Sequence, residues 1–122
     1  EENEQEDTNE PACESVRSND LYRTNFRERV ADVYAAFRAA AAGSPEVVRA
    51  FALERTIGLR DKLEVDHYTT PALEAAMKEV QNGSAPDTPR AMFARALTLA
   101  RETPLRTEEI QKILKPNLPV LK

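Results

Sequence analysis

The fold is decided by one stretch, YRTNFRERVADVYAAFRAAAAGSPE, which runs from Tyr22 to Glu46. Its large apolar residues recur every three or four positions, which is the spacing of one face of an α-helix. They are Tyr22, Phe26, Val30, Val33, Tyr34 and Phe37. Ser18 or Asn19 can cap the start of this helix, and Gly43 is placed to end it in the left-handed conformation. The stretch therefore predicts a helix over residues 19–42 and the start of a second helix after Gly43.

The second helix begins with a pair that the chain repeats, a Ser or Thr followed by Pro. Four of the eight prolines stand in such pairs: Ser44-Pro45, Thr70-Pro71, Thr88-Pro89 and Thr103-Pro104. The pairs are either sites for a proline-directed kinase or helix starts, where the hydroxyl accepts a hydrogen bond from a first-turn amide and Pro presets φ. An apolar helical pattern follows each pair, so we interpret the first three as caps. In the last segment either Thr103 or Thr107 is the cap, because acidic residues follow Thr107 directly.

The second helix has two possible extents because it contains Gly58. A glycine costs about 1 kcal/mol in a helix interior. Either the helix ends near Ile57 and a short helix covers 59–65, or one kinked helix runs from 45 to 66. We prefer the long version.

The remaining segments complete an all-α fold. Asn82-Gly83 ends the third helix and Lys115-Pro116 stops the last one. We expect a compact bundle of four to five helices over residues 18–115, followed by an extended C-terminal tail over 116–122. The expected core residues are Phe26, Val30, Val33, Phe37, Val48, Phe51, Leu73, Met77, Val80, Phe93, Leu97, Ile110 and Leu114.

Charge is unevenly distributed along the chain. Residues 1–20 carry eight acids against one base, whereas the rest of the chain carries 13 acids against 16 bases. An acidic segment with few apolar residues cannot bury enough surface to offset the entropy of ordering it. We therefore expect a disordered acidic N-terminal arm over residues 1–17. Its Cys13 is the single cysteine, and it is either an idle exposed thiol or a site of intermolecular disulfide formation or attachment.

Two features bear on localisation. The chain starts at Glu1, which indicates either a fragment or a mature form left after removal of a targeting peptide. No apolar run approaches the roughly 20 residues that span a bilayer, so we expect a soluble protein.

Motifs for enzymatic chemistry are few. The only histidine, His67, lies between Asp66 and Tyr68, but consecutive residues point in different directions on a helix. We therefore expect a solvated imidazole rather than an acid/base group. A zinc site needs about four ligands, and the three glycines are too scattered for a phosphate-binding loop. We expect a non-enzymatic protein without a metal or cofactor.

Arginine is the residue type that points to a function. Most bases after residue 20 are arginines, and the planar guanidinium suits a carboxylate or a phosphate. The candidate partner-binding residues on the first and fourth helices are Arg23, Arg27, Tyr34, Arg38, Arg90, Arg95 and Arg101. The plainer interpretation is a solvated helix face in which Glu28 and Asp32 neutralise the arginines.

These residues leave three functions open. The first is a protein–protein interaction module or a small subunit of a larger assembly, with a partner that is acidic. The second is a helical carrier that binds an apolar ligand between its helices. The third is a weak nucleic-acid binder, which the small excess of bases after residue 20 makes the less favoured partner.

One tripeptide resembles a family signature. Leu21–Arg23 reads LYR, which is similar to the signature of the LYR-motif family of mitochondrial assembly factors, small helical adaptors. The resemblance extends to a later phenylalanine, Phe37 or Phe51. In that family the tripeptide lies near the start of a basic first helix, whereas here an acidic segment precedes it. We do not transfer the function of that family to this chain.

Overall fold

The computed structural model describes residues 16–114, with side chains from Asp20 onward, and these residues form an all-α bundle. The α-helices are α2 (Val16–Ala41), α3 (Glu46–Lys62), α4 (Thr70–Asn82), α5 (Pro89–Glu102) and α6 (Thr107–Leu114). A 3-10 turn, η1 (Val65–His67), connects α3 to α4. The expected fold class is confirmed. The expected boundary of the acidic arm at residue 17 was wrong, because α2 already begins at Val16. The arm up to residue 15, Cys13 and the C-terminal tail lie outside the described residues.

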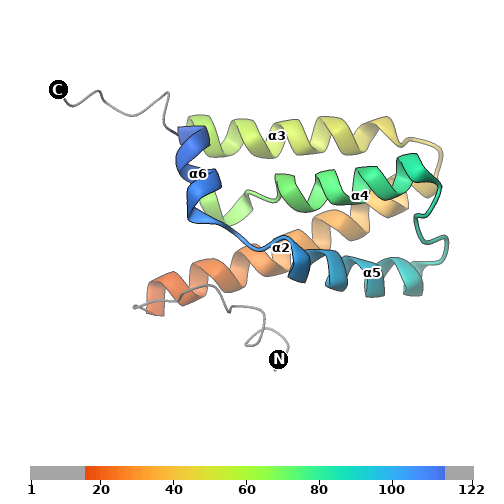
Figure 1. Cartoon of the computed structure of the whole chain (residues 1–122), viewed down its shortest axis with the longest axis horizontal. Helices are drawn as coiled ribbons and strands as arrows, with labels where there is room; N and C mark the ends of the chain where they lie inside the picture. The colour runs from red at the N-terminus through yellow and green to blue at the C-terminus, as the bar shows by residue number, and fades with distance from the viewer. Residues whose placement is uncertain (1–15, 115–122) are drawn as a thin grey trace.

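The long first helix organises the bundle. Figure 1 shows α3, α4 and α5 running side by side, while α2 crosses them and α6 closes one end of α3. The buried core lies between α2 and the other three long helices. A second, smaller apolar cluster joins Leu59, Tyr68 and Leu105 to the side chains of α6.

Most of the expected core is confirmed. Phe26, Val30, Val33, Phe37, Val48 and Leu73 are buried, and six more are partly buried: Phe51, Met77, Val80, Leu97, Ile110 and Leu114. The expectation for Phe93 was wrong, because this ring is 50% exposed. In α5 the buried stripe runs through Met92, Ala96, Leu99 and Ala100, so the helix is rotated relative to the expected phase and Phe93 lies beside the core.

The helix ends follow backbone rules closely. Gly43 and Gly83 have φ values of 94° and 75° and end α2 and α4, as expected for a left-handed terminal residue. The long version of the second helix is confirmed as far as Lys62, but it stops there rather than at residue 66. The reason is Leu63, which adopts φ 56° while its amide donates to the carbonyl of Leu59.

The capping predictions had mixed outcomes. Thr88 caps α5, because its hydroxyl accepts a hydrogen bond from the amide of Ala91 at 3.2 Å. The prediction for Thr70 was wrong, since its hydroxyl donates to the carbonyl of Ala52 in α3 and so links two helices. The side-chain cap predicted at Ser44 is also absent: the residue before α3 is Pro45, and Ser44 contributes its backbone carbonyl. In the last segment, Thr103 ends α5 and α6 begins at Thr107.

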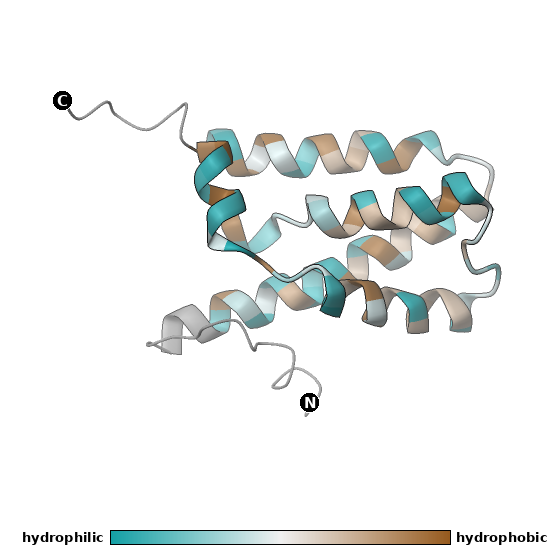
Figure 2. Cartoon of the chain, viewed as in Figure 1, coloured by the Kyte–Doolittle hydropathy of each residue, from teal (hydrophilic) through white to brown (hydrophobic). Residues whose placement is uncertain are grey.

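None of the helices in residues 16–114 is long and apolar enough to cross a membrane. Figure 2 shows hydrophilic and hydrophobic residues interleaved along each helix, as expected where one face of a helix packs and the other meets water.

Candidate functional site

The candidate arginines lie on two adjacent helices that run in opposite directions. Figure 1 shows α2 rising obliquely from left to right and α5 running from right to left. Two contacts fix their register: Arg29 Nε donates to the carbonyl of Ala100 at 3.1 Å, and the rings of Tyr34 and Phe93 have centroids 6.2 Å apart. Because numbering rises along one helix and falls along the other, this register places Arg27 across from Arg101 and Arg38 across from Arg90.

An aromatic pair occupies the centre of this surface. The Tyr34 and Phe93 rings meet edge to face at 75°, a geometry worth about 0.5–1.5 kcal/mol beyond area burial. A guanidinium nitrogen of Arg38 donates to the Tyr34 hydroxyl at 2.8 Å. We call this surface the α2–α5 face and define it by Arg27, Tyr34, Arg38, Arg90, Phe93 and Arg101.

Two candidate residues lie elsewhere. Arg95 points to α4, where its Nε donates to both carboxylate oxygens of Glu79, and this hydrogen bonding raises the pKa of Arg95. Arg23 lies in the first part of α2 and pairs with Asp20 at 3.7 Å. The register of α2 and α5 places Arg23 beyond the end of α5. The structure therefore joins Arg38, Tyr34 and Phe93 directly, and Phe93 is a residue that the sequence analysis assigned to the core. Arg27, Arg90 and Arg101 are exposed on the same two helices.

Two acids of α2, Glu28 and Asp32, are directed to α3 rather than to the α2–α5 face, whereas Asp20 lies beside Arg23. Asp32, which is buried, accepts from Arg55 Nε at 2.9 Å, and Glu28 accepts from the same guanidinium at 3.5 Å. Although burial opposes it, the hydrogen bond to Asp32 raises the pKa of Arg55. Both carboxylates are thus directed to α3. The arginines of α2 that belong to the α2–α5 face project from a different side of the same helix.

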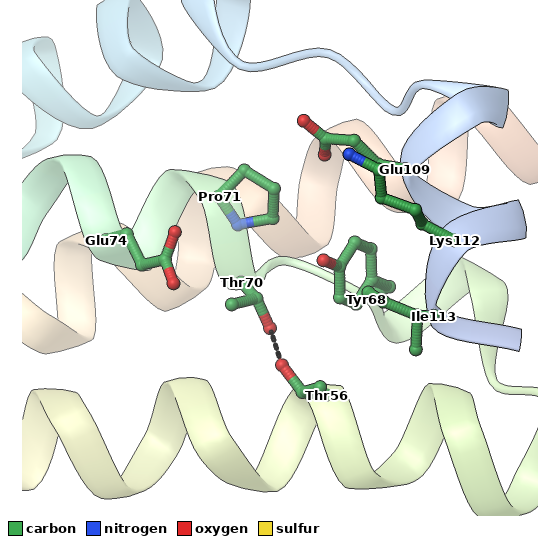
Figure 3. Close-up of a pocket in the computed structure, with 8 residues that line it drawn as sticks. All are labelled: Thr56, Tyr68, Thr70, Pro71, Glu74, Glu109, Lys112 and Ile113. Carbon is green, nitrogen blue, oxygen red and sulfur yellow. Dashed lines mark hydrogen bonds between the residues drawn. The ribbon is translucent and has the colours of Figure 1, made fainter. Parts of the chain in front are cut away.

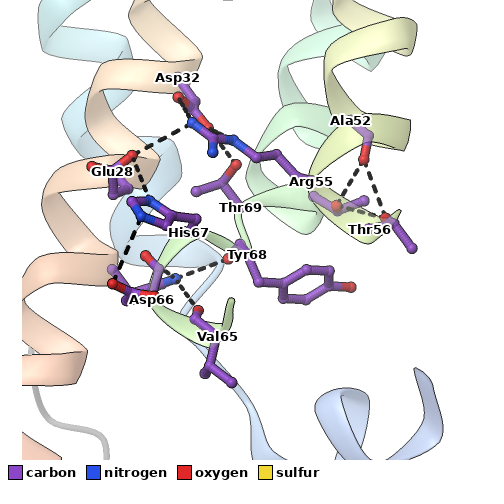
Figure 4. A network of polar contacts seen from close by, with 12 residues as sticks. Glu28, Asp32, Ala52, Arg55, Thr56, Val65, Asp66, His67, Tyr68 and Thr69 are labelled. Atoms are coloured by element: carbon purple, nitrogen blue, oxygen red, sulfur yellow. Dashed lines mark hydrogen bonds and ion pairs between the residues drawn. The ribbon is translucent and has the colours of Figure 1, made fainter. Parts of the chain in front are cut away.

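A buried polar network joins α2 to η1 and to α5, and Figure 4 shows Val65, Asp66 and Tyr68, whose carbonyls take part in it. Asn25 is fully buried, and its Nδ2 donates to the carbonyls of Val65, Asp66 and Tyr68 at 2.9–3.3 Å. Its Oδ1 accepts from Arg29, which is also buried and binds the end of α5. The sequence analysis missed this network. The signal was present, since Asn25, Arg29 and Asp32 recur at helical spacing beside the apolar stripe of α2.

His67 lies between two carboxylates instead of being fully solvated as expected. Its Nδ1 is buried 3.5 Å from Glu28 Oε1, and its Nε2 is 3.8 Å from Asp66 Oδ2. The imidazole is therefore only partly solvated, with 40% of its side chain exposed. Tyr68 points away from it into a separate cavity (Figures 3 and 4).

That cavity lies between α3, α4 and α6 and has a volume of about 320 Å³ (Figure 3). It is lined by Thr56, Tyr68, Thr70, Pro71, Glu74, Glu109, Lys112 and Ile113. Burial, together with the charges of Glu109 and Glu74, raises the pKa of Tyr68 to about 12, so its phenol is protonated near neutral pH. Its lining combines three charged side chains, Glu74, Glu109 and Lys112, with the apolar surfaces of Pro71 and Ile113.

Within the described residues, no group of three or more His, Cys, Asp and Glu side chains is arranged to hold a metal ion. Comparisons with protein-family models, curated proteins and solved structures gave no match to this chain. The likeness of Leu21–Arg23 to the LYR signature thus gains no support from them. Any functional assignment must come from the surface itself.

Proposed function

We propose that this chain is a non-enzymatic helical interaction module, and that its α2–α5 face binds an acidic segment of a protein partner. The observation that carries the proposal is the Tyr34–Phe93 pair, in which a half-exposed phenylalanine rests against a second ring among arginines. Binding energy at protein interfaces concentrates on aromatic residues and arginine. The pair supplies an anchor for an apolar side chain of the partner.

The charge of the partner follows from the distribution of ions around α2. Glu28 and Asp32 are directed to Arg55 on α3, so they lie away from the α2–α5 face. The arginines of that face can form paired hydrogen bonds with carboxylates. An acidic segment with one large apolar residue therefore matches both parts of the face.

The proposal is tested with a fluorescent 15-residue peptide that carries glutamates and one central phenylalanine, in a binding titration at low and physiological salt. We expect saturable binding that weakens with salt, because exposed ion pairs are screened. Phe93→Ala should weaken binding about tenfold, and Arg38→Glu with Arg90→Glu should weaken it further.

Matched controls keep the test specific. Lys78→Glu makes the same kind of charge reversal on α4, and Val47→Ala trims an exposed apolar residue on α3. Both variants should bind like the parent. The proposal fails if they weaken binding as much as the face variants do. It also fails if single-stranded DNA of equal charge binds as tightly as the peptide, because the face would then be recognising charge alone.

A further inference from the structure

The cavity between α3, α4 and α6 contains groups that the proposed function does not use. Its volume of about 320 Å³ lies at the lower end of the range of small-molecule sites. Its lining comes from α3, from the residues around the start of α4, and from α6. Figure 3 shows Glu74 on the α4 side and Glu109 on the α6 side of the Tyr68 phenol.

Two polar groups of the cavity wall are already engaged. The hydroxyls of Thr56 and Thr70 lie 2.8 Å apart, and each also donates to the carbonyl of Ala52 in α3, at 3.2 Å and 3.0 Å. A hydroxyl carries one proton, so both protons are used within the wall. These bonds join α4 to α3 and leave neither threonine with a donor for a ligand.

The phenol of Tyr68 is available to a ligand as an acceptor. Tyr68 is only 6% exposed, and it lines the cavity. Thr70 lies beside the phenol but donates to Ala52 instead. Within the described residues no group donates a hydrogen bond to the Tyr68 oxygen. This oxygen can therefore accept a hydrogen bond from a molecule in the cavity.

Two carboxylates stand near this phenol without a cation of their own. Neither Glu74 nor Glu109 forms an ion pair with another described residue. Burial, with the charges of Glu109 and Glu74, raises the pKa of Tyr68 to about 12, so both carboxylates act on the phenol. Among the described residues that line the cavity, Lys112 is the one base. The lining thus carries a net charge of −1.

We infer that this cavity binds a small primary amine in its ammonium form. The ammonium group lies between Glu74 and Glu109 and also donates a hydrogen bond to the Tyr68 oxygen, which matches its three N–H donors. The alkyl chain packs against Pro71 and Ile113, which are partly buried. The net negative charge disfavours an anion, and calcium needs about six to eight oxygen ligands. The inference does not depend on the function proposed for the α2–α5 face.

Titration of the isotope-labelled full chain with butylammonium chloride, followed by amide chemical shifts at constant ionic strength, tests the site. We expect saturable shifts at Tyr68, Thr70, Glu109 and Ile113. The Kd should be about 1–10 mM, because the ligand has few atoms. Butanoate and 1-butanol share the alkyl chain but lack the cation, so they should bind about tenfold more weakly.

Charge variants test the position of the ammonium group. Glu74→Gln and Glu109→Gln should each weaken butylammonium binding about threefold, and Lys112→Gln should strengthen it by a similar factor. Tyr68→Phe keeps the ring but removes the acceptor, and it should also weaken binding. Glu108→Gln removes the same charge from an exposed position of α6, so this matched control should bind like the parent. Thermal melts of the variants check that the fold is intact.

A lysine side chain carries the same ammonium group and alkyl chain as a free amine. N-acetyl-lysine methylamide is therefore titrated beside butylammonium. Binding of either compound at the cavity amides supports the inference, and the tighter of the two identifies the source of the ammonium group.

Four results would overturn the inference. One is the absence of saturable shifts with both ammonium compounds up to about 50 mM. Another is butanoate or 1-butanol that binds as tightly as butylammonium, because the cavity would then not select a cation. A third is Glu108→Gln that weakens binding as much as Glu109→Gln, since the overall charge of the chain would then explain the attraction. The last is weaker binding by Lys112→Gln, because the cavity would then hold an anionic group.

Discussion

Asn25 is the residue whose removal should reveal most about how this bundle is held together. Asn25→Ala deletes one acceptor for Arg29 and one donor shared by three carbonyls. The contacts to Val65 and Asp66 are only partly buried, so water can replace them at small cost. The contacts to Tyr68 and Arg29 are buried, and each partner left unsatisfied costs about 1–3 kcal/mol.

Loss of the two buried hydrogen bonds, to Tyr68 and to Arg29, together predicts a decrease of about 3–4 kcal/mol in the free energy of unfolding. For a domain of this size about 1 kcal/mol corresponds to 4–8 °C, so the thermal midpoint should fall by roughly 12–32 °C. Urea titration followed by circular dichroism measures the first quantity. Amide hydrogen exchange should show the largest loss of protection at η1, because Asn25 holds its carbonyls.

A double-mutant cycle separates the two buried contacts. Arg29→Met fills a similar volume without the charge, and its coupling to Asn25→Ala should be about 1–2 kcal/mol. Lys78→Ala, on the exposed side of α4, should change stability by less than about 0.5 kcal/mol. A loss below about 1 kcal/mol for Asn25→Ala, with protection at η1 unchanged, would refute the view that this network anchors the turn.

Four further outcomes are expected. Phe37→Ala should lower the free energy of unfolding by about 3–5 kcal/mol in a urea titration, because the ring is buried between helices; a loss below about 1 kcal/mol would mean that it is not a core residue. Thr88→Ala should cost about 1 kcal/mol through loss of its cap in the same assay, and an unchanged midpoint would remove the capping role. Leu63→Gly should raise the thermal midpoint, since φ 56° is unfavourable for leucine and its side chain is exposed; a lower midpoint would show that Leu63 stabilises the turn. Deleting residues 1–15 should increase the low-salt affinity of the acidic peptide, because their acids compete for the same arginines, and equal binding with and without them would exclude that competition.

The helices were predictable because their signals are local. The spacing of apolar residues in α2, and the glycines at 43 and 83, determine the structure within a few residues of themselves. The phase of α5 was harder, because Ala96 and Ala100 belong equally to a stripe through Phe93 and to a stripe through Met92. Only packing against α2 decides between them, and it buries Met92.

The polar contacts could not be predicted because they join distant segments. Asn25 bonds to carbonyls some 40 residues away, and Thr70 donates to α3 instead of capping its own helix. A sequence pattern shows that a polar residue lies next to an apolar stripe, but it does not show that a hydrogen-bond partner for that residue lies in the core. The candidate face shows the same limit, since Arg95 has the spacing of a surface residue yet pairs with Glu79.

The acidic and basic side chains of α2 contact different neighbouring helices, and this arrangement connects the fold to the proposed function. Asp32 and Glu28 form ion pairs with Arg55 of α3. Asp32 also accepts a hydrogen bond from the buried hydroxyl of Thr69, which precedes α4. These bonds fix the rotation of α2 about its axis, and the same rotation sets Tyr34 against Phe93 on α5. These two acids therefore do more than stabilise the bundle. By holding α2 in one orientation, they determine which of its arginines stand beside the exposed aromatic pair.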